Sequence, residues 1–366
     1  MANRQSPLEN MVDEYPTNPL AEDLDHILFH TQELWDEIRG KRIFITGGTG
    51  FFGCWLLESF AWVNDKLNLN ASVLVLSRNP QAFKKRAPHL FYHPAIEFHK
   101  GDVQDFEFPD SCFSYLIHAA VYQKPVGEKE SPSRMVNEML GGAKRVLDFC
   151  LLAKVEKMLL TSTGAVYGPV QPNLSRIPEG FSGSVDPAIS GSAYHHVRRM
   201  MESLSVLYAE EHGFDVKIAR CFSFIGPYLP LNGRFAVSDF ILSALSGSPI
   251  IVKGGGKPVR SYLYMADLMI WLWMILFRGT TSTPYNVGSE RPVTIKEIAE
   301  AIANEAVPPL GVSILDNNNN GVAQDYYVPN TERALSGLGL HQSIPLHIAI
   351  RKTMHWYRDK NSWKEN

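Results

Sequence analysis

A tyrosine and an arginine four residues apart, Tyr194 and Arg198, are the residues of this sequence best suited to acid–base chemistry. They fall in a segment with a helical pattern, where residues i and i+4 share one face, so the cation can stabilise a tyrosinate. A tyrosine placed in this way can take a proton from a substrate hydroxyl and return it. Thr163 ends an apolar run and adds a hydroxyl where the carboxyl ends of parallel strands border a ligand crevice. Taken singly, Tyr194 is more often a packing residue, so the interpretation depends on the whole group.

A glycine-rich stretch, KRIFITGGTGFFG at 41–53, predicts a buried strand, a tight turn and the start of a helix. Its G-x-x-G-x-x-G spacing differs from the G-x-G-x-x-G dinucleotide fingerprint only in the first interval and allows the same close backbone approach. Free amides at a helix N-terminus favour an anion, and a pyrophosphate is the natural occupant. An ordinary glycine turn before a helix is the alternative. The candidate cofactor-binding residues here are Gly47, Gly50, Phe51, Phe52 and Gly53.

Strand and helix patterns alternate over the next 150 residues or so, which predicts a parallel sheet with right-handed crossovers. The fold class expected is therefore α/β, with a Rossmann-type doubly wound parallel sheet. The predicted strands are 72–78, 95–103, 114–120, 157–163 and 216–220, and the predicted helices are 133–153 and 193–211.

From about residue 226 this rhythm weakens, and two late helices are expected near 294–305 and 345–358. The polar DNNNNG stretch at 316–321 is typical of an exposed loop. Three parts are expected: a helical N-terminal extension (1–40), an NAD(P)-binding Rossmann domain (41–225) and a smaller, mainly substrate-binding α/β domain (226–366).

The second strand ends in Ser77 and Arg78, where an acidic residue would bind the ribose diol of NAD. An arginine there suits the 2′-phosphate of NADP instead, because its planar cation can make paired hydrogen bonds to phosphate. A solvated arginine at the start of a loop is the alternative. NADP is therefore favoured as the cofactor, with NAD also possible.

The amino-acid composition limits the classes of binding partner that are expected. Charged residues make up 20% and hydrophobic residues 45% of the 366 residues, and the net charge is −3, so no polybasic surface for nucleic acid or membrane is expected.

The apolar run at 268–277 is too short to cross a bilayer and predicts a buried helix. The N-terminus lacks the pattern of a secretory signal, which predicts a cytoplasmic protein. Four scattered cysteines, without metal-ligand spacing, are expected to be reduced core residues: Cys54, Cys112, Cys150 and Cys221.

The order of several motifs resembles the extended short-chain dehydrogenases/reductases, also called the NAD-dependent epimerase/dehydratase family. The resemblance covers residues 41 to about 300. It rests on TGGTGFFG (46–53), GDV with Asp105 (101–105), HAA (118–120), STGAVYG (162–168), Tyr194 with its helix, FIGP (224–227), RSYLYMADL (260–268) and YNVGS (285–289).

The resemblance implies an enzyme that binds NAD(P) and acts on a nucleoside-diphosphate sugar. Asp102 and Val103 would border the adenine, and Ala119 and Ala120 would line the cofactor cleft. Thr163 and Tyr194 would engage the sugar hydroxyl being oxidised, Arg198 would stand at the position of the family's lysine beside the nicotinamide ribose, and Ser223 and Arg260 would bind substrate, Arg260 at the diphosphate.

Two departures from the family pattern bear on the reaction. Arg198 replaces a lysine, which keeps the charge in a longer and planar group. Gly164 and Ala165 replace the acidic pair that serves water elimination in nucleotide-sugar 4,6-dehydratases, and neither can move a proton. An acid from elsewhere, such as Glu138 or Glu179, could replace that pair.

These features predict an oxidoreductase acting at C4 of a nucleoside-diphosphate sugar, with 4-epimerisation as the leading reaction. A 4,6-dehydratase, a decarboxylase, a 4-ketoreductase and a non-catalytic dinucleotide-binding protein are the alternatives. The resemblance also implies a homodimer built on the helices at 133–153 and 193–211. The apolar side chains expected to supply its interface are Met135, Met139, Val146, Phe149, Met200, Met201, Leu204 and Leu207.

Overall fold

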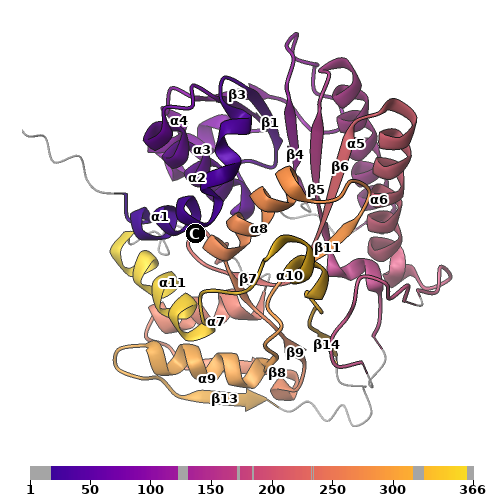
Figure 1. Ribbon diagram of the computed structural model, residues 1–366. Helices are drawn as coiled ribbons and strands as arrows, with labels where there is room; N and C mark the ends of the chain where they lie inside the picture. Colours follow the sequence, from indigo (N-terminus) through magenta and orange to yellow (C-terminus); the bar gives the residue numbers. More distant parts are fainter. Residues whose placement is uncertain are drawn as a thin grey trace, which may run out of the picture.

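A seven-stranded sheet forms the centre of the computed structural model, which describes residues 18–122, 131–170, 174–183, 185–231, 233, 235–315 and 325–360. The strand order is β11-β6-β5-β4-β1-β2-β3, and each neighbouring pair is parallel (Figure 1). The predicted doubly wound parallel sheet is therefore confirmed. Its strands are β1 (Arg42–Thr46), β2 (Ser72–Ser77), β3 (Ile96–Lys100), β4 (Tyr115–His118), β5 (Lys157–Thr163), β6 (Asp215–Cys221) and β11 (Pro284–Val287).

Helices cover both faces of this sheet. On one face α2 (Phe51–Leu67) and α8 (Met265–Arg278) pack together, with the short helices α3 (Pro80–Arg86) and α4 (Pro88–Phe91) beyond them. On the other face α5 (Pro132–Leu152) packs against α6 (Ala193–His212). Local signals fix these ends: Ser131 caps the start of α5, and α6 ends at the left-handed Gly213.

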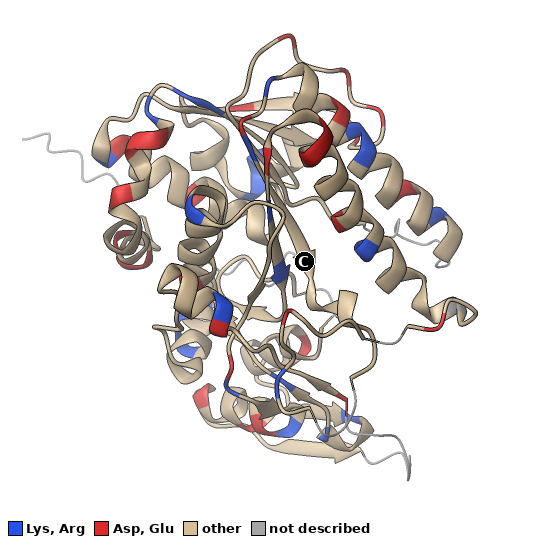
Figure 2. Ribbon diagram, turned by 45° about the vertical axis from the view of Figure 1, so that its right-hand side comes forward, with Lys and Arg blue, Asp and Glu red and all other residues tan. Residues whose placement is uncertain are grey.

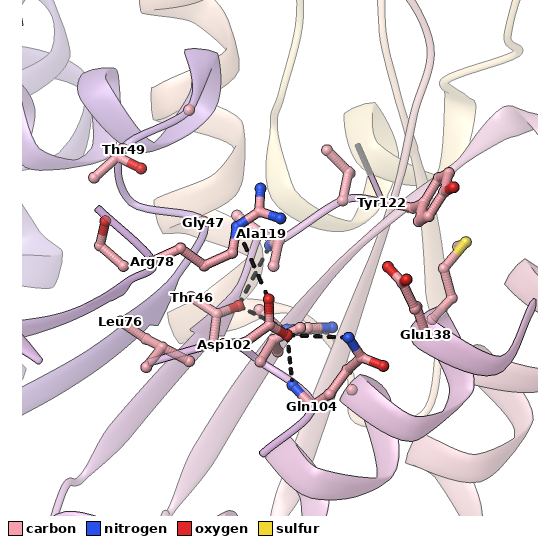
Figure 3. Close-up of a pocket in the computed structure, with 18 of the residues that line it drawn as sticks. Thr46, Gly47, Thr49, Leu76, Arg78, Asp102, Gln104, Ala119, Tyr122 and Glu138 are labelled. Carbon is pink, nitrogen blue, oxygen red and sulfur yellow. Dashed lines mark hydrogen bonds and ion pairs between the residues drawn. The ribbon is translucent and has the colours of Figure 1, made fainter. Parts of the chain in front are cut away.

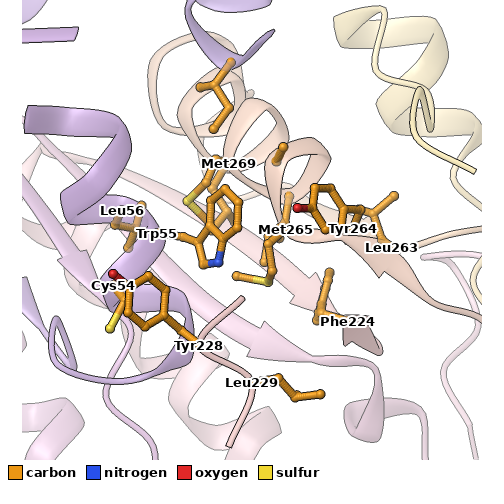
Figure 4. Close-up of a cluster of buried hydrophobic side chains, with 14 of the residues drawn as sticks. Cys54, Trp55, Leu56, Phe224, Tyr228, Leu229, Leu263, Tyr264, Met265 and Met269 are labelled. Carbon is orange, nitrogen blue, oxygen red and sulfur yellow. The ribbon is translucent and has the colours of Figure 1, made fainter. Parts of the chain in front are cut away.

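A large hydrophobic cluster includes the facing sides of α2 and α8. Figure 4 shows Trp55 of α2 facing Met265 and Met269 of α8. The Trp55 indole donates a 2.8 Å hydrogen bond to the carbonyl of Pro227, so its one polar atom is satisfied. The apolar run predicted as a buried helix is confirmed as part of α8. No helix in the described part of the chain is long and apolar enough to cross a bilayer.

The N-terminal extension forms α1 (Ala21–Thr31) and a 3-10 helix, η1 (Gln32–Ile38), that rest on α8 and α2. Asp23 accepts a 2.6 Å hydrogen bond from the phenol of Tyr264, and burial raises the pKa of this carboxyl. Lys352 on α11 (Leu346–Lys360) bonds to Asp23 and Glu22, so α1 and α11 lie side by side (Figure 1). The described part of the extension, residues 18–40, therefore packs on its own chain.

The remaining elements form a smaller layer beside the carboxyl ends of the large sheet. It contains three small sheets, β10-β7, β12-β9-β14 and β13-β8. Part of the chain after residue 226 nevertheless belongs to the large sheet, because α8 and β11 lie there. The domain boundary expected at 225/226 therefore does not separate the large sheet from the smaller layer, because elements of both layers follow it in the sequence. The elements of the smaller layer are β7 (Phe224–Ile225), α7 (Ala236–Leu245), β8 (Ile250–Lys253), η4 (Gly254–Gly256), β9 (Val259–Arg260), β10 (Leu263–Tyr264), β12 (Val293–Thr294), α9 (Ile295–Glu305), β13 (Val312–Leu315) and β14 (Tyr326–Tyr327). The helix α10 (Glu332–Leu338) contacts β11 and α8 instead. The loop expected at 316–321 lies outside the described residues.

Two sequence-based expectations need correction. Cys112 is exposed, whereas Cys54, Cys150 and Cys221 are buried free thiols. The apolar side chains of α5 proposed for a dimer interface, Met135, Met139, Val146 and Phe149, face the protein's own core and are at most 7% exposed. Amphipathic helices on a sheet bury one face in this way without a partner.

Of the proposed interface residues on α6, Met200 and Leu207 are each 49% exposed, whereas Met201 is buried. Charges of both signs are interspersed along the outer helices, as the small net charge implies (Figure 2). The apolar surface available to a partner is therefore narrower than the sequence suggested.

Candidate active site

The glycine turn between β1 and α2 packs too tightly for any side chain at two positions. Gly47 has φ +73°, and a Cβ there would lie 2.5 Å from the backbone of Ala119 and Ala120. A Cβ on Gly53 would lie 2.3 Å from the Gly47 carbonyl oxygen. Glycine at both sites lets β1, β4 and α2 meet closely and leaves the amides at the start of α2 accessible to a diphosphate.

A cavity of about 330 Å³ runs from this turn along the carboxyl ends of β2 and β4. Most of the predicted cofactor-binding residues line it: Gly47, Gly50, Phe51, Ser77, Arg78, Asp102, Val103, Ala119 and Ala120. Four of them do not line it. Gly53 packs under the turn, the Phe52 ring contacts Phe224 with centroids 5.0 Å apart, and Tyr194 and Arg198 lie outside the set of lining residues. A glycine turn, a helix N-terminus and a cavity of this extent together fit a dinucleotide.

At one end of the cavity, Arg78 and Asp102 face each other (Figure 3). Their charged atoms are 3.9 Å apart, and the Arg78 side chain is 61% exposed. Asp102 also accepts a 3.0 Å hydrogen bond from the amide of Gln104. Arg78 therefore borders the cavity as predicted, but with a carboxylate beside it that a 2′-phosphate would have to displace.

Tyr194 and Arg198 meet on α6, as their spacing predicted. Arg198 Nε donates a 3.2 Å hydrogen bond to Tyr194 Oη, and Arg198 is only 2% exposed. The segment η2 (Gly164–Tyr167) holds this helix: His195 Nδ1 lies 2.5 Å from the Ala165 carbonyl, and Arg199 donates to the Val166 carbonyl at 2.5 Å. The phenol and the guanidinium are thus fixed relative to the end of β5.

The imidazole of His118 at the end of β4 lies close to this pair and was not singled out from the sequence. Its Nδ1 is 2.7 Å from Thr46 Oγ1, which also accepts the amide of Ala120 at 3.3 Å. Burial, with the positive charge of Arg198 nearby, lowers the pKa of His118 to about 3. His118 is therefore a neutral hydrogen-bonding group at the cavity wall. The HAA motif at 118–120 was the signal that could have pointed to it.

Thr163 lies at the end of β5 with its Oγ1 accepting the amide of Ala165 at 3.2 Å. The same oxygen lies 3.3 Å from the phenol oxygen of Tyr327 on β14. Ser162 next to it donates a 2.5 Å hydrogen bond to Glu202, which also pairs with Arg220 at 2.7 Å. This buried network fixes the end of β5. Tyr327 carries no motif in the sequence, so it could be found only from the structure.

The two predicted substrate-binding residues outside the large sheet lie near β9 and β10. Arg260 bonds to the carboxylate of Asp325, and its guanidinium carbon lies 5.8 Å from the centre of the Tyr327 ring. The backbone carbonyl of Ser223 accepts the amide of Leu263 at 3.0 Å. The structure thus connects Arg260 to Thr163 through Tyr327, while the roles of Ser223 and Arg260 toward a substrate stay predictions.

The two carboxylates considered as replacements for the missing acidic pair differ in position. Glu138 lines the cavity opposite Arg78 and lies beside Tyr122 (Figure 3), where Arg134 donates to it at 2.5 Å. Glu179 accepts the backbone amide of Asn286 on β11 at 3.0 Å. Of these two carboxylates, Glu138 is therefore the one that faces the cavity. No cluster of three or more potential metal ligands occurs among the described residues.

The model of the NAD-dependent epimerase/dehydratase family matches residues 43–288, which include the glycine turn, the cavity and the Tyr194 helix. This chain belongs to the NAD-dependent epimerase/dehydratase family. It is accordingly an enzyme of the epimerase/dehydratase type.

Relatives in this family include UDP-glucuronic acid decarboxylase 6 of Arabidopsis thaliana, with 30% identity over 84% of this chain and 86% of the relative. UDP-glucuronic acid decarboxylase 1 of Xenopus tropicalis is 28% identical over 89% of this chain and 74% of the relative. Among solved structures, the UDP-glucose 4-epimerase of Thermotoga maritima has a TM-score of 0.73 and 19% identity, covering 87% of this chain and 99% of that one. The dTDP-glucose 4,6-dehydratase of Bacillus anthracis has a TM-score of 0.71 and 18% identity, covering 88% and 98%. These two structures share the fold.

Proposed function

We propose that this enzyme oxidises C4 of a nucleoside-diphosphate sugar with bound NAD(P), and that Tyr194 exchanges the proton of the C4 hydroxyl. The observation that carries the proposal is the 3.2 Å hydrogen bond between Arg198 Nε and Tyr194 Oη, with Arg198 near His118, whose imidazole lines the cavity. A buried cation needs a compensating partner, and a tyrosinate supplies one. The pair is thus suited to take up and release a proton.

Each residue has a separate task in this scheme. Tyr194 takes the hydroxyl proton, and Arg198 stabilises the phenolate that results. Thr163 donates a hydrogen bond to the oxygen at C4 and keeps it oriented. A nicotinamide bound in the cavity would supply hydride transfer from C4 and back. The amides at the start of α2 hold the cofactor diphosphate.

For the net reaction, we propose decarboxylation of a UDP-hexuronic acid. Once C4 is a ketone, the C6 carboxylate is a β-keto acid, so the electrons of the C5–C6 bond can pass into the C4 carbonyl as CO2 leaves. This step needs no protein base, and the carbon left behind requires one proton, which water can supply. Gly164 and Ala165, which offer neither acid nor base, are compatible with it. The family relatives of 28–30% identity named as UDP-glucuronic acid decarboxylases support the same choice.

Simple 4-epimerisation, the leading expectation from the sequence, is the second candidate. It also needs only Tyr194, Thr163 and the nicotinamide, so the glycine and alanine at 164 and 165 favour it as well. Dehydration is disfavoured because it must remove the C5 proton and protonate the departing hydroxyl, two tasks for which those positions supply no side chain.

The experiment is incubation of the purified protein with UDP-glucuronic acid, UDP-glucose and UDP-N-acetylglucosamine, each with NAD or NADP, followed by mass spectrometry and NMR. A product lighter by one CO2 from UDP-glucuronic acid is expected. A product of unchanged mass with inverted C4 would replace decarboxylation by epimerisation, and loss of one water would overturn both. Tyr194→Phe is the control, since any genuine turnover must fall with it.

The choice between NAD and NADP, the homodimer and the cytoplasmic location stay predictions. The family is described as NAD-dependent, which supports a nicotinamide dinucleotide at the cavity. Preference for NADP depends on Arg78 alone and is tested below.

A further inference from the structure

The space beside Gly164 is already filled by the protein. A Cβ at this position would lie 2.7 Å from the Tyr327 phenol oxygen and 2.7 Å from the Phe222 ring. No side chain can be added there without moving one of these groups. Gly164 and Tyr327 are therefore sterically complementary, although they are far apart in the sequence. The tyrosine phenol occupies the space that a side chain at position 164 would need.

Tyr327 reaches this position through strand pairing. β14 pairs in parallel with β9, which aligns Tyr327 with Arg260, and the amide of Val259 bonds to the Asp325 carbonyl at 2.8 Å. The Tyr327 ring then packs on Phe222, with ring centroids 4.5 Å apart. The phenol is thus held by backbone hydrogen bonds on one side and an aromatic contact on the other, so its hydroxyl points to a defined place.

That place is the hydroxyl of Thr163. The Thr163 oxygen accepts the Ala165 amide at 3.2 Å and lies 3.3 Å from Tyr327 Oη. Burial raises the pKa of Tyr327, so the phenol keeps its proton at neutral pH. A neutral phenol can donate to the threonine oxygen. Because both of these contacts then use Thr163 as an acceptor, its own hydrogen is left to point toward a substrate.

We infer that Tyr327 is a positioning residue of the sugar site: it occupies the space of the missing side chain at 164 and orients the Thr163 hydroxyl as a donor toward the sugar oxygen at C4. The inference rests on the proposed function only for the identity of that oxygen. It also explains why Gly164 suits this chain, since a larger residue would push the phenol away from Thr163.

A double-mutant cycle of Tyr327→Phe and Thr163→Val tests this role. Tyr327→Phe keeps the ring and removes only the hydroxyl, so kcat with UDP-glucuronic acid should fall about 3- to 10-fold, the worth of one neutral hydrogen bond, with little change in KM. In the Thr163→Val background the same substitution should have no further effect, because there is no hydroxyl left to orient. Tyr326→Phe is the matched control, since neighbouring strand residues point to opposite faces, and it should leave kcat unchanged.

Equal losses from Tyr327→Phe in both backgrounds, or no loss in either, would overturn the inference. Calorimetric binding of UDP-glucuronic acid to the protein loaded with NAD gives a second readout of the same cycle. If the wild type does not turn over this sugar, the proposed reaction fails, and the non-additivity of binding still decides the role of Tyr327. Should Tyr327→Phe not fold, Gly164→Ala displaces the phenol from the other side. It should lower kcat or affinity only while Thr163 is present.

Discussion

Arg198 and Tyr194 lie on one face of α6 and are hydrogen-bonded to each other. Among the described residues, the Arg198 side chain is hydrogen-bonded to Tyr194 alone, and Arg198 is 2% exposed. A cation buried in this way costs free energy unless negative charge is available to it. The phenolate that forms when Tyr194 takes a proton provides that charge, so arginine can serve where other family members carry lysine.

The first prediction concerns this pair. Tyr194→Phe should lower kcat by at least about 100-fold, the usual scale of general acid–base catalysis, and Arg198→Gln should lower it by roughly 10- to 100-fold. Arg198→Lys restores the charge and should recover most of the loss. The measurement is the initial rate at which UDP-glucuronic acid is converted to the product lighter by one CO2, followed by mass spectrometry. Lys144→Gln, an exposed site on α5, is the control. Full activity in Arg198→Gln would contradict the assignment.

Cofactor preference gives the second prediction. If Arg78 contacts a 2′-phosphate, NADP binds more tightly than NAD, and Arg78→Ala should weaken NADP by about tenfold while changing NAD little, given the exposure of the arginine. Asp102→Asn should favour NADP further, because it removes the carboxylate 3.9 Å from Arg78. Calorimetry with both dinucleotides measures these constants. Lys85→Ala on α3 is a matched loss of one exposed cation. Equal affinities of the wild type for NAD and NADP would contradict the predicted preference for NADP.

The third prediction concerns the effect of His118 on the way folding stability depends on pH. Its folded pKa of about 3 lies below the usual value near 6.5, so the unfolded chain binds a proton between these values that the folded chain does not. Stability is therefore lost as pH falls through 6.5, by about 2 kcal/mol between pH 7 and pH 5 from this one group. His118→Asn should unfold in urea with a correspondingly smaller pH dependence. Parallel curves for variant and wild type would show that His118 is not held neutral.

The fourth prediction is a homodimer whose contact includes the outward side of α6. Met200→Glu or Leu207→Glu places a charge on an apolar side chain that is 49% exposed and should shift light scattering at micromolar concentration toward a monomer and lower activity. Leu335→Glu on α10, where the leucine is 47% exposed, is the control and should leave the mass unchanged. A wild type that is active as a monomer at this concentration would disprove the dimer.

Sequence patterns predicted the first half of the fold well, because its strands and helices follow each other along the chain and show their own periodicity. β11 was missed as a member of the large sheet. It has four residues and pairs with β6 across more than 60 intervening residues, and local periodicity carries no information about such a partner.

The residues of the candidate site divide in the same way, into those with a local sequence signal and those without one. Thr163, Tyr194 and Arg198 could be found because spacing on one strand and one helix places them. Tyr327 could not, since its contact with Thr163 joins residues 164 positions apart and depends on the pairing of two short strands. For Arg260, the sequence indicated the residue but not its partner Asp325, which follows the polar stretch at 316–321.

The return of β11 and α8 to the large sheet has a mechanical consequence. After β6 the chain passes into the smaller layer, returns to the sheet through α8 and β11, and leaves again for α9 and β13. Rotating the smaller layer away from the large sheet would have to bend all of these crossings together, whereas a hinge usually bends at only a few. The two layers are therefore expected to move little against each other during turnover. Access to Tyr194 and Thr163 would then depend on shorter segments near these two residues.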